Sequence, residues 1–285
     1  REGLTSVGVV PTGGLVSGQS AWADLDGNEA ARALAVPSLA LHVLIDDATH
    51  ETVRESHASS LLRLRELLDD ARLYRQKRQG YEDNRLRTLG TSRLDLETLV
   101  RALEGTLPVV FHVDRASDIL AVLALAAEYR LVPVVASAAE GWKVAPALAA
   151  AKVPVIVYPL DHGPRSFAAR GAREDNAALL TAAGVAVSLS TGESHNARKL
   201  RQEAGNAVRA GLSRRAALAA VTSQPARAFG LGERYGSLAP GHVGNAVVWS
   251  ADPFELSTQA LAVVVRGKLT SLRTRQTALF LRYRP

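Results

Sequence analysis

The second half of the chain alternates between short apolar runs and longer segments of helical composition. Continuous apolar, β-branched runs predict buried strands at 107–113, 131–137, 153–160 and 185–191. Each run precedes a segment that predicts a helix, at 116–130, 140–152, 174–184 and 195–211. Strands without polar alternation, joined by helical crossovers, are typical of a parallel sheet that is covered on both faces.

Two more strand-like segments, 4–12 and 38–45, precede this repeat. The whole pattern fits an α/β fold of the TIM type, a (β/α)8 barrel whose first strand is missing, and it also fits an open doubly wound sheet. The chain starts with Arg1 inside a strand-like segment, so we expect that the natural N-terminus lies upstream. The stretch "PTGGLVSGQSA" lacks the spacing of a phosphate-binding loop and predicts a tight structural loop.

The pattern changes after residue 212. Residues 213–230 predict a helix that Ser213 caps and that Pro225 breaks near its end. Short apolar runs separated by Gly and Pro follow, and they predict a small C-terminal β appendage rather than another strand–helix unit. We therefore expect a barrel over residues 1–230, and a β-sandwich portion with a C-terminal tail over residues 231–285.

Composition narrows the classes of partner. The formal net charge is +6, but the basic residues gather mainly in 61–87, where interleaved acids indicate a solvated helix with ion pairs along its face. No zinc finger, aromatic RNA-binding motif or glycine-rich nucleotide loop accompanies them, so nucleic acid is not an expected partner. No apolar run reaches the roughly 18 residues that span a bilayer, and we expect a soluble protein of the cytoplasm or periplasm without a membrane partner. The absence of Cys excludes disulfides and thiolate-bound metals.

Polar side chains follow the predicted strands at the ends where a barrel gathers its chemistry. His112 ends the strand 107–113 and is either a metal ligand or general base, or a histidine that caps a buried strand beside Asp114. Asp161 and His162 follow the next strand but one, where they either line the barrel mouth or belong to an exposed loop.

Further candidates lie on the neighbouring loops. Glu193 and His195 follow the strand 185–191 and are either catalytic groups or ordinary residues of a helix start. Arginines that could bind a substrate carboxylate bidentately, or could instead form surface ion pairs, are Arg115, Arg165 and Arg173. His42 lies toward the end of the strand candidate in 38–45 and could also face the mouth.

Two motifs carry a family resemblance. "GLTSVGVVPTGG…SGQSA" lies near the start, and "AALAAVTSQPARAFGLGERYGSLAPGHVGNAVVWSADP" lies near the end. Together they resemble the metal-dependent amidohydrolase superfamily, most closely its imidazolonepropionase-like members. The second motif is the more specific one, although Asn245 stands where relatives carry Ala or Asp. The resemblance covers essentially the whole chain.

The resemblance implies a (β/α)8 barrel flanked by a small β-sandwich, with one or two divalent metals at the barrel mouth. His112 matches the family's ligand after strand five. Ser137 stands where relatives carry a second His, and Thr191 or Gly192 stands where they carry Asp. The family's H-x-H pair would lie upstream of Arg1, and no carboxylated Lys is apparent.

We therefore expect a hydrolase that cleaves a C–N bond of a small molecule with metal-assisted attack by water. The alternative is a degenerate, metal-free relative that pairs with an active homologue. The expected metal, zinc in the first place if the chain is active, would be held by His112. The expected catalytic residues are Glu193, His195 and Asp161, and the expected substrate-binding residues are Arg115, His162 and Arg173. We expect a homo- or heterodimer.

Overall fold

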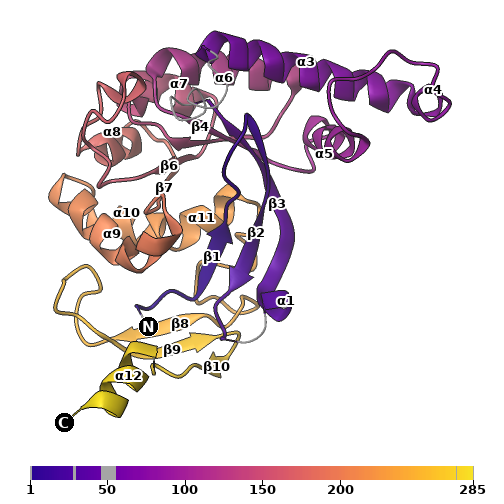
Figure 1. The fold of residues 1–285 in the computed structure, drawn as a ribbon. Coiled ribbons are helices and arrows are strands. Elements are labelled where there is room, and N and C mark those ends of the chain that lie inside the picture. The colour runs from indigo at the N-terminus through magenta and orange to yellow at the C-terminus, as the bar shows by residue number, and fades with distance from the viewer. Residues whose placement is uncertain (1, 28–29, 46–55, 274, 285) are drawn as a thin grey trace.

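A seven-stranded sheet organises the protein (Figure 1). The computed structural model describes residues 2–27, 30–45, 56–273 and 275–284. The strands lie in chain order across the sheet, and they are β1 (Ser6–Val9), β2 (Val16–Asp24), β3 (Leu34–Leu44), β4 (Val109–Val113), β5 (Pro133–Ser137), β6 (Val155–Val157) and β7 (Val187–Leu189). The first three pair antiparallel, and β3 to β7 pair parallel. The described strands thus form a curled half-barrel of the α/β class, in keeping with the predicted barrel that lacks its first strand.

The first strands depart from the predicted strand–helix repeat. The stretch predicted as a structural loop contains most of β2, which pairs with β3 along its length. Gly18 lies opposite His42 at a register shift and has φ +113°, a conformation that glycine adopts without strain. The small polar residues of β2 carry little strand propensity, so the pairing with β3 decides this conformation.

Helices cover the outer face of the parallel strands. They are α3 (His57–Gln76), α5 (Arg93–Leu103), α6 (Ala116–Tyr129), α7 (Ala145–Ala150), α8 (Asn176–Ala182), α9 (Leu200–Arg209) and α10 (Arg214–Ala220). Shorter elements between them are α4 (Arg78–Glu82), η1 (Gly141–Val144), η2 (Phe167–Ala169) and η3 (Ser194–Lys199), and α11 (Ser223–Ala228) instead packs Ala226 against Trp22 and Leu39. Alternate strand residues such as Phe111 and Val135 pack outward against helical residues such as Ile119 and Leu148 in the main core. A second cluster on the inner face contains Ala40, Val110, Val134 and Ala136, with Phe229 packed against it.

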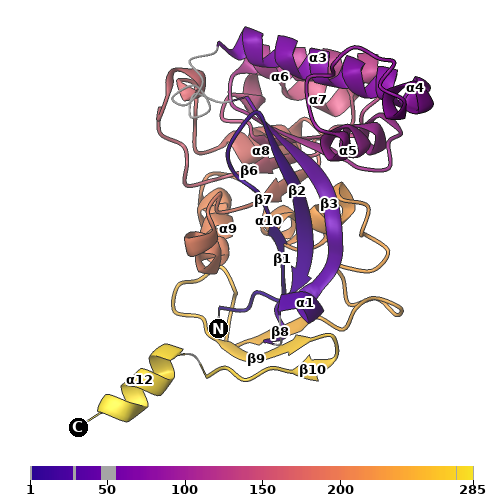
Figure 2. The same cartoon turned by 45° about the vertical axis from the view of Figure 1, so that its right-hand side comes forward.

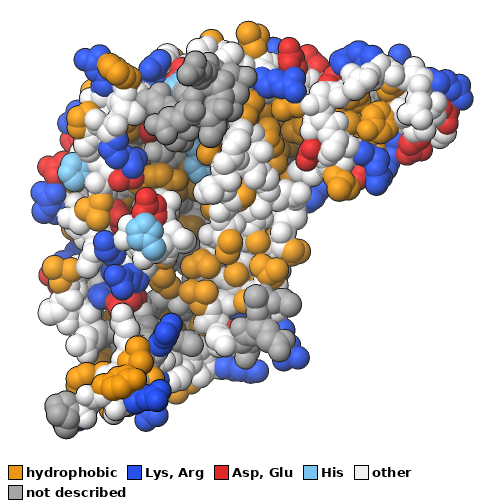
Figure 3. Space-filling view, viewed as in Figure 1, with side chains coloured by type: hydrophobic (Ala, Val, Ile, Leu, Met, Phe, Trp, Pro, Cys, Tyr) orange, Lys and Arg blue, Asp and Glu red, His pale blue; other side chains and the backbone are white. Residues whose placement is uncertain are grey.

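The helix predictions are largely confirmed. Ser213 caps α10 by accepting a hydrogen bond from the Ala216 N–H, but the predicted helix 213–230 is divided into α10 and α11. The Arg-rich segment forms α3 and α4 and carries the predicted ion pairs, for example Arg63 with Glu66 and Arg78 with Glu82. Charges of both signs alternate on this helical arm (Figure 3).

The C-terminal β appendage is an antiparallel sheet of three strands, β8 (Ala246–Trp249), β9 (Ala260–Val265) and β10 (Lys268–Leu269). Its membership of a β-sandwich stays a prediction. The last helix, α12 (Arg275–Tyr283), has no buried residue and stands apart from the body (Figure 2). Among the described residues, none of the helices combines the length and hydrophobicity that a membrane span requires.

One buried carboxylate joins the start of the chain to its C-terminal sheet. Asp24 has no exposed surface at the end of β2, near the short helix α1 (Ala30–Ala33). Its oxygens accept hydrogen bonds from Ser6 Oγ at 2.6 Å, Tyr235 Oη at 3.0 Å and Arg266 Nε at 2.7 Å, and Asn245 Nδ2 lies at 3.3 Å. Residues more than 200 positions apart therefore meet at a single side chain.

Candidate functional site

The carboxyl ends of the parallel strands are aligned. The register pairs Val113 with Ser137, Ser137 with Val157 and Val157 with Leu189 across four neighbouring strands. The loops that follow these residues carry Asp114 to Arg115, Ala138 to Glu140, Tyr158 to His162, and Ser190 to His195. The fold thus brings the predicted site residues to one edge of the sheet, where parallel sheets of this class bind their ligands.

Two histidines meet at this end of the sheet. His42 on β3 is 2% exposed, and its Nδ1 lies 2.9 Å from Nε2 of the half-buried His112 on β4. Burial, and secondarily the proximity of His112, lower the pKa of His42 to about 3, so that its imidazole is neutral at physiological pH. His42 Nε2 is buried without a hydrogen-bond partner among the described residues. The sequence placed His42 at a strand end but gave no sign of this pairing.

The described residues do not fit a complete catalytic zinc site. Catalytic zinc takes about three protein ligands, and nitrogen atoms bound to one tetrahedral zinc lie about 3.4 Å apart. The two imidazoles here engage each other at 2.9 Å, within hydrogen-bond distance. In the part of the chain that the structure describes, no group of three His, Asp or Glu residues is arranged to hold a metal. His112 stays a predicted ligand, and no reaction step is assigned to a metal here.

The neutral His42 predicts a loss of stability in acid. The unfolded chain binds a proton at this residue near pH 6.5, whereas the folded chain binds it only near pH 3, so stability falls as the pH drops between these values. We expect the free energy of unfolding to fall by about 2 kcal/mol from pH 7 to pH 5 through this residue. Urea denaturation at both pH values measures it. His42→Asn should flatten this dependence and His195→Asn should not, and equal slopes in all three proteins would contradict the prediction.

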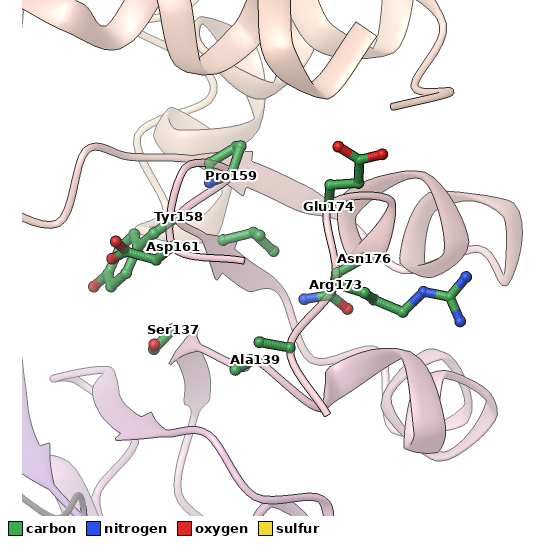
Figure 4. A pocket seen from close by; sticks show the side chains of 10 residues that line it. Ser137, Ala139, Tyr158, Pro159, Asp161, Arg173, Glu174 and Asn176 are labelled. Carbon is green, nitrogen blue, oxygen red and sulfur yellow. The ribbon is translucent and has the colours of Figure 1, made fainter. Parts of the chain in front are cut away.

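Asp161 is the clearest candidate for proton transfer at this edge of the sheet. Burial raises the pKa of Asp161, Arg165 at 3.0 Å opposes this shift, and the nearby charges of Glu193 and Asp114 add to it. Asp161 lines a small pocket together with Ser137 and Tyr158 (Figure 4). The pocket has room for about one water molecule.

Glu203, a residue that the sequence analysis did not single out, contacts the loop that carries Asp161. Glu203 on α9 is 4% exposed and accepts a hydrogen bond from the Leu160 N–H at 2.8 Å. Burial raises the pKa of Glu203 to about 6. His162, predicted to bind substrate, turns its Nδ1 to the Pro159 carbonyl at 3.0 Å within this same loop. The one sequence signal for Glu203 is its position four residues before Ala207 on the buried stripe of α9.

Removing the charge of Glu203 is expected to stabilise the protein above neutral pH. The folded-state pKa lies above the unfolded value, so ionisation costs stability as the pH rises through about 6. Glu203→Gln should raise the free energy of unfolding at pH 8 by up to about 2 kcal/mol, less the loss of a charged acceptor for Leu160. The difference should vanish at pH 4, and chemical denaturation at both pH values measures it. A stabilisation that is the same at pH 4 would refute the electrostatic cause.

Glu193 and His195 lie at the same edge but are exposed. His195 Nε2 is 3.0 Å from Glu193 Oε2, and the two side chains are 73% and 59% exposed. Asn196 donates a hydrogen bond to the same carboxylate at 3.2 Å. Glu193 and His195 therefore lie among the polar contacts that are ordinary at the start of a helix. Their catalytic role stays a prediction.

The three candidate arginines differ in their partners. Arg165 pairs with Asp161. Arg173 donates from Nε and Nη2 to Asp175, and its guanidinium lies 4.7 Å from the Trp142 ring centroid. Its side chain extends away from Ser137 and Asp161 (Figure 4). Arg115 is half-buried and makes no side-chain hydrogen bond or ion pair with any described residue.

Glu140 ties three of the strand-end loops together. Its Oε2 accepts from the Ala116 N–H at 3.1 Å, and its Oε1 accepts from the Gly171 N–H at 3.0 Å and from Lys143 Nζ at 2.6 Å. Burial works to raise the pKa of Glu140, but these hydrogen bonds outweigh it and hold the pKa below its usual value. A Cβ at Gly171 would lie 2.6 Å from Oε1, so a larger residue there would displace the ends of the Glu140 and Lys143 side chains. The sequence showed no sign of this contact, because it depends on the spacing of loops.

Part of the chain matches the model of a known family, and its fold is similar to that of solved structures. The family model described as the amidohydrolase family matches residues 167–271. An amidohydrolase from Thermotoga maritima MSB8 superimposes with a TM-score of 0.86 at 24% sequence identity, over 95% of this chain and 73% of that one. An adenosine deaminase from Xanthomonas campestris with bound zinc gives a TM-score of 0.48 at 20% identity, over 67% of this chain and 53% of that one. No curated protein matches. Residues 167–271 thus carry an amidohydrolase-family segment, within a chain whose fold is similar to that of the Thermotoga amidohydrolase.

Proposed function

We propose that this protein is an amidohydrolase-type hydrolase that cleaves a C–N bond of a small molecule at the carboxyl edge of β4 to β7. The observation that carries the proposal is Asp161, whose carboxyl group has a raised pKa and lines a water-sized pocket at this edge. A carboxyl group with a perturbed pKa in a pocket is a functional-site candidate. The family match over 167–271 supports the hydrolase class. Kinship with the imidazolonepropionase-like members belongs to the same proposal.

The proposed reaction uses the chain's own groups. Asp161 in its ionised form takes a proton from a water molecule as the water oxygen adds to the carbonyl carbon of the substrate. The C–N bond then breaks, and the proton passes from Asp161 to the leaving nitrogen. The products are a carboxylic acid and an amine. Glu193 and His195 form a second proton-exchanging pair at the same edge, and His162 borders the substrate.

A hydrolysis screen tests this function. The full chain is incubated with cyclic amides, N-acyl amino acids, ureas and amidines, with and without added zinc, and released amine or ammonia is measured. We expect turnover of at least one class, and loss of that turnover in Asp161→Asn. No turnover of any class would refute the proposal.

A second candidate is a non-catalytic subunit that pairs with an active homologue. The described residues do not supply a complete set of metal ligands, and this favours the second candidate. The hydroxyl of Ser137 is a poor zinc ligand, and Gly192 has no side chain that could bind a metal. Metal analysis after incubation with zinc separates the two candidates. If the chain is a non-catalytic subunit, it should bind no stoichiometric metal and should show no turnover on its own. Light scattering should then detect a stable dimer. A monomer with turnover would refute it.

A further inference from the structure

We propose that the C-terminal sheet and α12 bind the surface of an anionic phospholipid bilayer, with α12 lying in the headgroup region. This binding does not depend on the proposed hydrolysis at the carboxyl edge of β4 to β7. It replaces the sequence-based expectation that a membrane is not a partner, because that expectation considered only apolar runs long enough to span a bilayer.

The C-terminal region carries positive charge without acids of its own. Residues 256–285 contain no Asp or Glu, and their basic residues are Arg266, Lys268, Arg273, Arg275, Arg282 and Arg284. The whole chain has 34 Lys and Arg against 28 Asp and Glu, so residues 1–255 are balanced and the net charge of +6 arises here. Arg266 pairs with Asp24, and the other five cations make no ion pair with any described residue.

The helix α12 exposes apolar side chains among these charges. It has no buried residue, and it stands apart from the body at the same end of the molecule as the three-stranded sheet (Figures 1 and 2). Arg275 and Arg282 are seven residues apart and share one face of the helix, whereas Phe280 and Leu281 lie on the opposite side. Arginines on one side and Phe and Leu on the other are typical of helices that lie in a membrane interface.

The C-terminal sheet has an exposed apolar face as well. Leu269 pairs with Val264 and Val248 pairs with Ala262, so these four side chains lie on one face of the sheet. Val248 and Leu269 are exposed there, whereas Val263, which points to the other face, is buried. Both elements of the region therefore present apolar surface to solvent.

Charge and side-chain type favour a lipid surface over two other occupants. Two copies of this chain would bring together surfaces of the same sign, which repel each other. A nucleic acid would attract the arginines but would give the exposed leucines of the region no stacking partner. An anionic bilayer complements both properties, because its phosphates attract the arginines and its acyl chains bury the apolar side chains.

Sedimentation with vesicles tests the inference. The full chain is mixed with vesicles of phosphatidylcholine alone or of phosphatidylcholine with phosphatidylglycerol, and the sedimented fraction gives each partition coefficient. We expect binding to the anionic vesicles to be at least about tenfold stronger than to the neutral ones, and to weaken as NaCl is raised. Equal partition into both kinds of vesicle, or into neither, would overturn the inference.

A pair of charge variants locates the binding surface. The double variant Arg275→Gln, Arg282→Gln should weaken binding to the anionic vesicles by about 25-fold, since each basic residue near the surface contributes about fivefold. The matched control is Arg75→Gln, Arg215→Gln, which removes the same charge from exposed arginines of α3 and α10. It should leave binding within about twofold, because these charges act on the membrane only at long range. Equal losses in the two double variants would overturn the inference.

Insertion of the apolar side is tested by Phe280→Gln. Its control is Leu62→Gln, which replaces an equally exposed apolar residue on the helical arm. We expect only Phe280→Gln to weaken binding, by about tenfold, through the lost burial of the ring. In Phe280→Trp, the emission of the added Trp should shift to the blue on anionic vesicles. Unchanged binding in Phe280→Gln, displacement from the vesicles by a single-stranded oligonucleotide, or a dimer that dissociates in Phe280→Gln would overturn the inference.

Discussion

Replacing Asp161 by Asn is expected to lower kcat/KM for the hydrolysed substrate by about 10²- to 10⁴-fold, which is the usual contribution of a general base. Asn keeps the shape of the side chain and cannot accept a proton from water. The pair with Arg165 is partly exposed, so its loss should change stability by less than about 1 kcal/mol. The activity of the unmodified protein should fall in acid as Asp161 becomes protonated, at a pH above the usual aspartate range.

Asp175→Asn is the matched control for this prediction. Asp175 also pairs with a neighbouring arginine, Arg173, but there the hydrogen bond from the arginine lowers the pKa of Asp175. The two aspartates have side chains of nearly equal exposure, 32% and 31%, and differ in the charges that face them, since only Asp161 lies near two other acids, Glu193 and Asp114. Steady-state kinetics of both variants across pH 4 to 9 would decide. Equal losses in the two variants, or an unchanged rate in Asp161→Asn, would remove Asp161 from the reaction.

The second large effect is on stability. Asp24→Ala is expected to lower the free energy of unfolding by about 3 kcal/mol, because the fully buried carboxylate is the acceptor of several hydrogen bonds, while the Arg266 side chain, 35% exposed, is partly solvated after its loss. Arg266, Tyr235 and Ser6 would all lose their acceptor at once. Arg266 also has φ +51°, an unfavourable conformation for a residue with a side chain, and the contact with Asp24 helps to hold it there.

Asp252→Ala tests whether burial is the cause. Asp252 pairs with Arg214 in the same C-terminal region, but its side chain is 34% exposed and that of Arg214 is 56% exposed. Its loss should cost at most about 1 kcal/mol. Urea denaturation followed by circular dichroism measures both variants. A cost for Asp24→Ala that does not exceed the cost for Asp252→Ala would show that the buried cluster does not couple the first strands to the C-terminal sheet.

Apolar patterning predicted the order of strands and helices from residue 107 to residue 211, since each strand there is buried on both faces and each helix has a packed stripe. It also placed His112, Asp161 and Glu193 at strand ends, because the positions of polar residues after apolar runs are a local property. It did not predict β2, whose small polar residues become a strand only through pairing with β3. Nor did it predict that Arg165 and Arg173 pair with carboxylates, whereas Arg115 has no ion pair with any described residue.

The sequence by itself determined the parallel strand–helix repeat and the residue types at the carboxyl edge of the sheet, because hydrophobic period and turn residues act over a few positions. The tertiary structure alone decided the protonation and pairing of those residues. His42 meets His112 from 70 positions away, and Asp24 meets Arg266 from 242 positions away. Burial and neighbouring charge set each pKa, and both arise only when distant segments of the chain pack together.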